Sequence, residues 1–195
     1  MEKQKKEQAL EILKETCKNC DKCTLATTRQ QVVFGYGNPG ALVMFIGEAP
    51  GADEDTQGKP FVGRAGKLLT TMMSEAGLLR EKVYISNIAK CRPPQNRPPT
   101  SEESSTCKNL ILFKEIEIIN PLIICTLGST ATQALLGSTQ INSTRGKLHS
   151  FNNIPLLPTY HPAYILRDPS KRDLVIADFK KIIQILKGII SDRKK

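Results

Sequence analysis

Short apolar segments alternate along this chain with segments of helical periodicity, and no other feature limits the possible folds as strongly. Each apolar segment is bounded by glycine, proline or polar residues, as buried strands are. The four segments are residues 41–46, 83–86, 122–127 and 154–157. The helical patterns cover residues 63–76, 101–119, 129–136 and about 173–190. The alternation predicts a three-layer α/β/α fold, with helices on both faces of a central, mostly parallel, four-stranded sheet.

The length of 195 residues suits a single domain with a core large enough to fold without staples. We expect residues 1–16 to form a short amphipathic helix and residues 188–195 a basic tail. The first segment is charged throughout, unlike the apolar part of a signal peptide, and no apolar run approaches the thickness of a bilayer. We therefore expect a protein without a membrane partner in the cytoplasm of a bacterium or archaeon, with the eukaryotic nucleus as the alternative. We also expect a monomer.

The chain carries a formal net charge of +9, from 28 Lys and Arg against 19 Asp and Glu. Such an excess suggests a polyanionic partner, for example a nucleic acid. A solvated surface with basic ends explains the same charge equally well. The charge alone therefore does not decide between the two.

The six cysteines indicate reduced thiols, metal ligation or catalysis rather than a framework of disulfides, because no secretory signal is recognised. Cys17, Cys20 and Cys23 have the spacing that opens a ferredoxin cluster sequence, but the Cys-Pro that would complete it is absent. The missing ligands would come from Cys91 and Cys107, which flank a proline-rich loop. One of the N-terminal cysteines is then left over, and four thiolates suit either zinc or an iron-sulfur cluster.

Polar side chains follow three of the predicted strands. Glu48 comes directly after the first strand, Asn87 after the second, and His161 close to the end of the fourth. Because ligands bind at the carboxyl ends of the strands in an open α/β sheet, we expect the three at one edge, with Gly47 and Gly51 letting the backbone approach a ligand. Each polar residue alone has a simpler explanation, as a helix cap, a turn or a histidine bound to backbone. Their joint placement favours a site that binds a heterocycle.

Longer motifs run through the chain in a fixed order. They are residues 47–51 (GEAPG), 54–55 (ED), 58–66 (GKPFVGRAG), Asn87, 90–94 (KCRPP) and 161–164 (HPAY). Together they resemble the motifs of the family 4 uracil-DNA glycosylases, and the similarity extends from about Cys20 to the C-terminal helix. The resemblance implies a [4Fe-4S] cluster with a structural role, held by Cys20, Cys23, Cys91 and Cys107, with Cys17 as the spare thiol.

The resemblance further implies hydrolysis of the bond between uracil and deoxyribose in DNA, on a base flipped out of the helix. His161, as a neutral imidazole, would donate to uracil O2 and stabilise the charge on the leaving base. Glu48 would orient or activate the water, or its charge would favour the cationic sugar. Asn87 would bind uracil O4 and N3–H, a pattern that cytosine presents in reverse.

Four further residues are expected at the substrate by the same resemblance. Phe61 would stack on the base, and Glu54 would crowd the C5 edge of uracil and exclude thymine. Ala49 and Gly51 would lie against the substrate.

Contacts to DNA are expected from basic loop residues and from the segment after His161. Arg92 and Arg97 are the loop candidates for phosphate contacts. Tyr164 to Arg167 would form a wedge near the minor groove, with Tyr164 and Arg167 as its DNA contacts.

Three alternative functions agree less well with the sequence. A protein that traps uracil covalently on a loop histidine is disfavoured, because residues 90–99 contain no histidine. A non-catalytic zinc module that binds nucleic acid would explain the charge and the cysteines but not the polar residues at the strand ends. Phosphate binding at residues 47–51 has little support, because the lysine and hydroxyl of a P-loop are missing.

Overall fold

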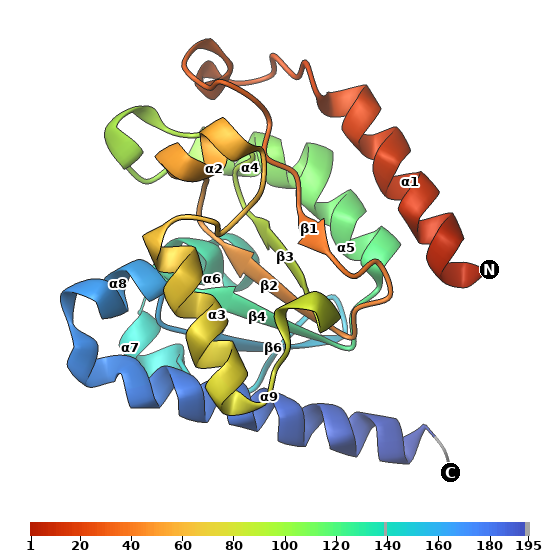
Figure 1. The fold of residues 1–195 in the computed structure, drawn as a ribbon, viewed down its shortest axis with the longest axis vertical. Coiled ribbons are helices and arrows are strands. Elements are labelled where there is room, and N and C mark those ends of the chain that lie inside the picture. Colours follow the sequence, from red (N-terminus) through yellow and green to blue (C-terminus); the bar gives the residue numbers. More distant parts are fainter. Residues whose placement is uncertain (139, 194–195) are drawn as a thin grey trace.

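A six-stranded sheet forms the centre of the computed structural model, which describes residues 1–138 and 140–193 (Figure 1). The strand order is β1-β3-β2-β4-β6-β5. The strands are β1 (Tyr36–Gly37), β2 (Val43–Gly47), β3 (Tyr84–Asn87), β4 (Ile123–Leu127), β5 (His149–Phe151) and β6 (Ile154–Thr159). The four inner strands are parallel, whereas β1 and β5 pair antiparallel at the two edges.

The predicted strand count of four is therefore too low, although the four predicted strands are the parallel centre of the sheet. Both additional strands are very short, and neither contains the apolar run that marks a buried strand. β5 turns into β6 through Asn152 and Asn153, which have positive φ angles of 48° and 64°. This is the backbone geometry of a two-residue hairpin, for which asparagine is a favoured residue.

Helices cover both faces of the sheet, so the predicted three-layer α/β/α architecture is confirmed (Figure 1). The α-helices of the described residues are α1 (Glu2–Cys17), α2 (Ala52–Gln57), α3 (Arg64–Ala76), α4 (Ser101–Cys107), α5 (Phe113–Ile119), α6 (Ser129–Leu136), α7 (Ile141–Thr144), α8 (Pro162–Arg167) and α9 (Arg172–Asp192). α3 and α9 lie together on one face, and α1, α5 and α6 lie on the other. A π-helical turn, Lys108–Leu112, joins α4 to α5, so the predicted helix 101–119 is continuous.

The core has two layers because side chains alternate between the faces of each inner strand. In β2, Val43 and Phe45 pack toward α3 and α9, and Met44 and Ile46 pack toward α1, α5 and α6. All four side chains are at most 3% exposed. Inner strands buried on both faces hold the residues at their carboxyl ends in fixed positions.

The two ends of the chain differ slightly from the prediction. The N-terminal helix ends at Cys17, one residue beyond the predicted 1–16. α9 continues to Asp192, so most of the predicted tail 188–195 is helical, and residues 194–195 lie outside the described part of the chain. Among the described helices, none combines the length and the apolar character needed to cross a membrane.

Candidate active site

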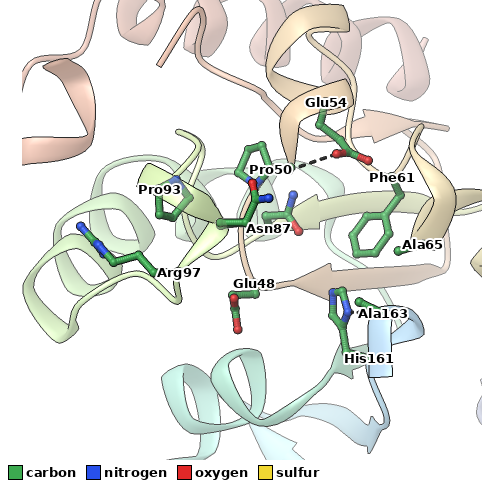
Figure 2. A pocket seen from close by; sticks show the side chains of 13 residues that line it. Glu48, Pro50, Glu54, Phe61, Ala65, Asn87, Pro93, Arg97, His161 and Ala163 are labelled. Atoms are coloured by element: carbon green, nitrogen blue, oxygen red, sulfur yellow. Dashed lines mark hydrogen bonds between the residues drawn. The ribbon is translucent and has the colours of Figure 1, made fainter. Parts of the chain in front are cut away.

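A cavity of about 200 Å³ lies at the carboxyl ends of the parallel strands, and Glu48, Asn87 and His161 all line it (Figure 2). The three residues follow or end β2, β3 and β6, as the sequence predicts. Its other lining residues are Ala49, Pro50, Gly51, Glu54, Phe61, Ala65, Pro93, Asn96, Arg97 and Ala163. Side chains far apart in the sequence thus surround one space the size of a small ring.

Asn87 presents an unsatisfied acceptor in this cavity. The residue is 2% exposed, and its Oδ1 has no hydrogen-bond partner among the described residues. A buried amide oxygen left unpaired costs free energy, so the site gains when a ligand supplies a donor. Gly47 leaves room for the side chains of Asn87 and Phe61, because a Cβ there would lie 2.5 Å from Asn87 Oδ1 and 2.5 Å from Phe61 Cζ.

The rings of Phe61 and His161 form one wall of the cavity, with centroids 5.7 Å apart and planes inclined by 38°. Phe61 has a positive φ of 55°, which is unusual for a bulky residue. Gly66 permits this turn, since a Cβ on it would lie 1.9 Å from the Phe61 carbonyl oxygen. The GKPFVGRAG motif therefore builds the turn that places the aromatic ring.

His161 is held as a neutral imidazole. Burial, and to a lesser degree the charge of Arg167, lowers the pKa of His161 to about 4. Its Nδ1 accepts a hydrogen bond of 3.1 Å from the Ala163 backbone N–H. With Nδ1 acting as an acceptor, the proton of the neutral ring is on Nε2, which becomes a donor.

Glu48 stands where the first cavity meets a second, larger one of about 630 Å³. Glu48 and His161 line both cavities, and Tyr164 and Arg167 line only the second. The Thr130 hydroxyl donates a hydrogen bond to Glu48 Oε2. A carboxylate at this junction faces both a ring-sized pocket and a wider space beside it.

Comparison with known protein families matches residues 34–187 to the uracil DNA glycosylase superfamily. The chain is 42% identical over 187 residues to the type-4 uracil-DNA glycosylase of Thermotoga maritima, which covers 93% of this chain and 97% of the relative. It is 44% identical over 187 residues to that of Sulfurisphaera tokodaii (91% and 84%) and 40% identical over 193 residues to that of Pyrobaculum aerophilum (94% and 96%). The chain belongs to the uracil-DNA glycosylase superfamily. The resemblance predicted from the motifs is confirmed.

In this member of the superfamily, Glu54 braces the loops around the cavity. Its Oε1 accepts hydrogen bonds from the backbone N–H groups of Val62 (3.0 Å) and Gly63 (2.9 Å). Its Oε2 accepts one from the backbone N–H of Gly51 (3.0 Å), the bond drawn in Figure 2. The carboxylate thus ties α2 to the loop that carries Phe61. Ala49 and Gly51, which the resemblance predicts to lie against the substrate, line the cavity.

The four residues predicted to contact DNA in this member of the superfamily do not all lie at the same cavity. Arg97 lines the first cavity but also pairs with Glu103 at 2.8 Å. Arg92 lines neither cavity, and its Nε donates to Asn96 Oδ1 at 2.8 Å. Tyr164 and Arg167 line the second cavity, and the Tyr164 hydroxyl donates to Asp168 at 3.2 Å. Of these four residues, Tyr164 and Arg167 therefore line the second cavity, whereas Arg92 and Arg97 do not.

The cysteines predicted as ligands come together from two segments of the chain. Arg29 donates to Cys91 Sγ at 3.5 Å, and the Lys90 backbone N–H donates to Cys107 Sγ at 3.2 Å. Burial raises the pKa of Cys91 to about 11 and that of Cys107 to about 12, and the nearby Cys23 thiol acts in the same direction on both. N–H groups aimed at sulfur suit thiolate ligands, whose charge a metal centre would offset.

Two further observations bear on the cysteine segments. Glu103, one turn before Cys107, accepts hydrogen bonds from Arg97 and from the Thr24 hydroxyl (2.7 Å), which follows Cys23 directly. This carboxylate joins the N-terminal cysteine segment to α4. Within the described residues, no group of three or more His, Cys, Asp or Glu side chains is arranged as the ligands of a single metal ion.

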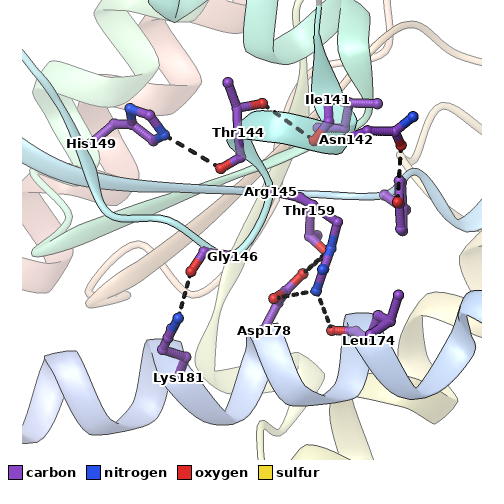
Figure 3. Close-up of polar contacts among 11 residues, drawn as sticks. Ile141, Asn142, Thr144, Arg145, Gly146, His149, Thr159, Leu174, Asp178 and Lys181 are labelled. Atoms are coloured by element: carbon purple, nitrogen blue, oxygen red, sulfur yellow. Dashed lines mark hydrogen bonds and ion pairs between the residues drawn. The ribbon is translucent and has the colours of Figure 1, made fainter.

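Supporting residues that the motifs do not reveal lie behind His161. The Thr159 hydroxyl donates to Asp178 at 2.6 Å, and Arg145 donates to the same carboxylate at 2.7 and 3.2 Å (Figure 3). Burial raises the pKa of Asp178, while Thr159 and Arg145 oppose that shift. The network fixes the end of β6, two residues before His161, against α9. Asp178 falls within the ordinary amphipathic pattern of that helix, so the sequence offers no separate signal for it.

Proposed function

We propose that this protein releases uracil from DNA by hydrolysing its N-glycosidic bond and leaves an abasic site, as a DNA repair enzyme. The observation that carries the proposal is the buried Oδ1 of Asn87 in the ring-sized cavity, which has no hydrogen-bond partner within the described part of the chain. Uracil N3–H supplies the donor that this oxygen lacks, and the Asn87 amide N–H donates to uracil O4. Cytosine has an acceptor at N3 and a donor at position 4, so it would leave buried groups unpaired.

In this mechanism His161 stabilises the leaving base. Uracil departs as an anion, and its O2 gains charge mainly in the transition state. A neutral imidazole donating from Nε2 would stabilise that charge without holding the ground state equally tightly. The backbone bond to Nδ1 and the pKa of about 4 both support this tautomer and charge state.

Glu48 serves the sugar side of the reaction. Its carboxylate stands at the opening between the base cavity and the larger cavity, which would receive deoxyribose and flanking phosphates. From there it would orient the attacking water, or stabilise the cationic sugar by its charge. Phe61 would stack on the flipped base, a contact worth about 1–3 kcal/mol.

A [4Fe-4S] cluster on Cys20, Cys23, Cys91 and Cys107 forms part of the proposal. Cys20 and Cys23 both raise the pKa of Cys91, which supports their place beside it, and Cys17 is the spare thiol by the resemblance. When bound, the cluster would join the N-terminal segment to the loop and helix that follow Asn87. Its contribution would be structural.

The remaining parts of the proposal concern the partner and the setting. Uracil-containing DNA is the proposed partner, with phosphate contacts from Arg92 and Arg97 and a wedge that includes Tyr164 and Arg167. Glu54 would exclude thymine indirectly, by bracing the loops that narrow the cavity. The protein would act as a monomer in the cytoplasm, and the relatives named above come from bacteria and archaea.

An oligonucleotide assay tests the proposed activity. Purified protein is incubated with DNA containing uracil opposite guanine, uracil opposite adenine or unpaired uracil, and abasic sites are then cleaved with alkali. We expect cleavage at uracil and none in matched DNA with cytosine at that position. Cleavage no greater than that of heat-inactivated protein would refute the proposal, and DNA left covalently attached to protein would favour the trapping alternative.

A further inference from the structure

The carboxylate of Glu48 has a side-chain partner that none of the sequence motifs contains. Thr130 donates its hydroxyl to Glu48 Oε2 across 82 residues of sequence. Thr130 is the second residue of α6, and its hydroxyl does not cap that helix: among the described residues, α6 has no side-chain cap. The hydroxyl is therefore directed at Glu48 rather than at the helix to which it belongs.

The segment from Gly128 to Thr130, which begins α6, lies against both proposed catalytic residues. Gly128 has a φ of 88°, and a Cβ on it would lie 2.9 Å from the Cβ of His161. Its N–H donates to the Thr159 carbonyl oxygen at 2.8 Å, and its own carbonyl oxygen accepts from the Thr132 hydroxyl at 2.8 Å. These bonds fix the loop between β4 and α6. One short segment thus sets the position of His161 on one side and of Glu48 on the other.

A hydroxyl bound to one carboxylate oxygen restricts rotation of the whole group. An exposed glutamate carboxylate rotates broadly about its last torsion. With Oε2 held by Thr130, Oε1 is left to face the reacting centre in a defined direction. Such a restraint matters for a group that must orient a water molecule, because small displacements of a positioned nucleophile cost large factors in rate. The same restraint on rotation matters little for a carboxylate that acts only through its net charge.

We infer that Thr130 is a positioning residue for Glu48, and that Glu48 therefore orients the attacking water rather than acting by charge alone. This inference rests on the proposed function. It assigns the two oxygens of Glu48 different tasks: Oε2 accepts from Thr130, and Oε1 binds the water. Thr130 itself touches neither substrate nor water.

The test compares Thr130→Val, which removes the hydroxyl and keeps the branched shape, with Thr130→Ser, which keeps the hydroxyl. Single-turnover rates and DNA affinities are measured on unpaired uracil, with Thr71→Val as a control that makes the same substitution on the exposed side of α3. We expect Thr130→Val to lower the rate about 10-fold or more while DNA affinity changes less than about twofold. Thr130→Ser should stay within about threefold of wild type, and Thr71→Val should match wild type.

A Glu48→Gln background supplies the second measurement. If Thr130 acts through Glu48, adding Thr130→Val to Glu48→Gln should change the rate less than about twofold, since the oriented carboxylate is already gone. Full activity in Thr130→Val, equal losses in the valine and serine variants, or a parallel loss of DNA affinity would overturn the inference while leaving the proposed function intact. A wild-type protein that releases no uracil would overturn both.

Discussion

Lys90 and Glu115 form an ion pair of 2.7 Å in which both side chains are at most 1% exposed. The Lys90 ammonium also donates to the Asn87 carbonyl oxygen at 2.7 Å and to the Ser86 hydroxyl. Glu115 in turn accepts from the Gly35 backbone N–H at 2.7 Å. The pair thus anchors the end of β3, where the proposed base-reading amide lies, against α5. Lys90 also adjoins the cysteine segment through its backbone.

Removing one member of this pair should destabilise the protein strongly. Lys90→Met leaves the Glu115 carboxylate buried without a counter-ion, a change that costs about 3–5 kcal/mol. Urea unfolding at pH 7, followed by circular dichroism, measures the free energy of unfolding. Lys67→Met, on the exposed side of α3, serves as the control and should stay within about 0.5 kcal/mol of wild type. If Lys90→Met and Lys67→Met gave the same small change, the buried pair would have no structural importance.

The pattern of apolar residues predicts the inner part of this fold well, because strands buried on both faces leave a continuous apolar run. It also predicts that Glu48, Asn87 and His161 meet, since parallel strands bring their carboxyl ends to one edge. The two edge strands leave no such run, because they are only two and three residues long.

The apolar pattern and the motifs do not predict which side chains, distant in the sequence, form hydrogen bonds or ion pairs with each other. Thr130 and Glu115 lie within ordinary helical patterns. Their side chains bind Glu48 and Lys90 because the fold brings distant segments of the chain together. Glu54 shows the same limit: its motif identifies a residue near the base, whereas the fold reveals a carboxylate occupied by three backbone N–H groups. The position of a residue was predictable, and its bonding was not.

Asn87→Asp should relax the choice between uracil and cytosine. A protonated aspartate can donate to cytosine N3 and accept from its amino group, so the reversed base no longer leaves buried groups unpaired. Sites that select by hydrogen bonding discriminate by about 10⁴–10⁵, and we expect the variant to lose at least about 100-fold of that preference. The ratio of kcat/KM on the two bases measures it. Asn38→Asp, in a turn outside the cavity, should leave the ratio unchanged; an unaltered ratio in Asn87→Asp would assign base reading elsewhere.

The pKa of His161 gives the activity a defined acid limit. The neutral ring is the proposed donor, so kcat/KM should fall as pH drops through about 4 and should show no break near 6.5. Between about 4 and 6.5 the histidine of the unfolded chain binds a proton that His161 in the folded protein does not, so the stability that His161 contributes also decreases as pH falls through this window.

Nuclear magnetic resonance titration checks this pKa directly, because the chain has only two histidines. His149→Gln identifies the signal of His161. Arg167→Gln removes a positive charge that lowers the pKa, so the midpoint should move upward, though not fully to 6.5, since burial is the larger cause. A His161 midpoint near 6.5 in the wild-type protein would contradict the neutral-donor mechanism at mildly acidic pH.

The cysteine assignment predicts which thiols the cluster requires. Cys91→Ala removes a proposed ligand, and protein purified without oxygen should lose most of its iron and its broad visible absorption. Cys17→Ala and Cys125→Ala are the matched controls: Cys17 is the proposed spare thiol, and Cys125 is fully buried within β4, where it packs as a small apolar residue. Both should keep iron and colour close to wild type. Loss of the cluster in Cys17→Ala together with its retention in Cys20→Ala would exchange the roles of those two cysteines. A colourless wild-type protein that contains zinc would instead replace the cluster with a four-thiolate zinc site.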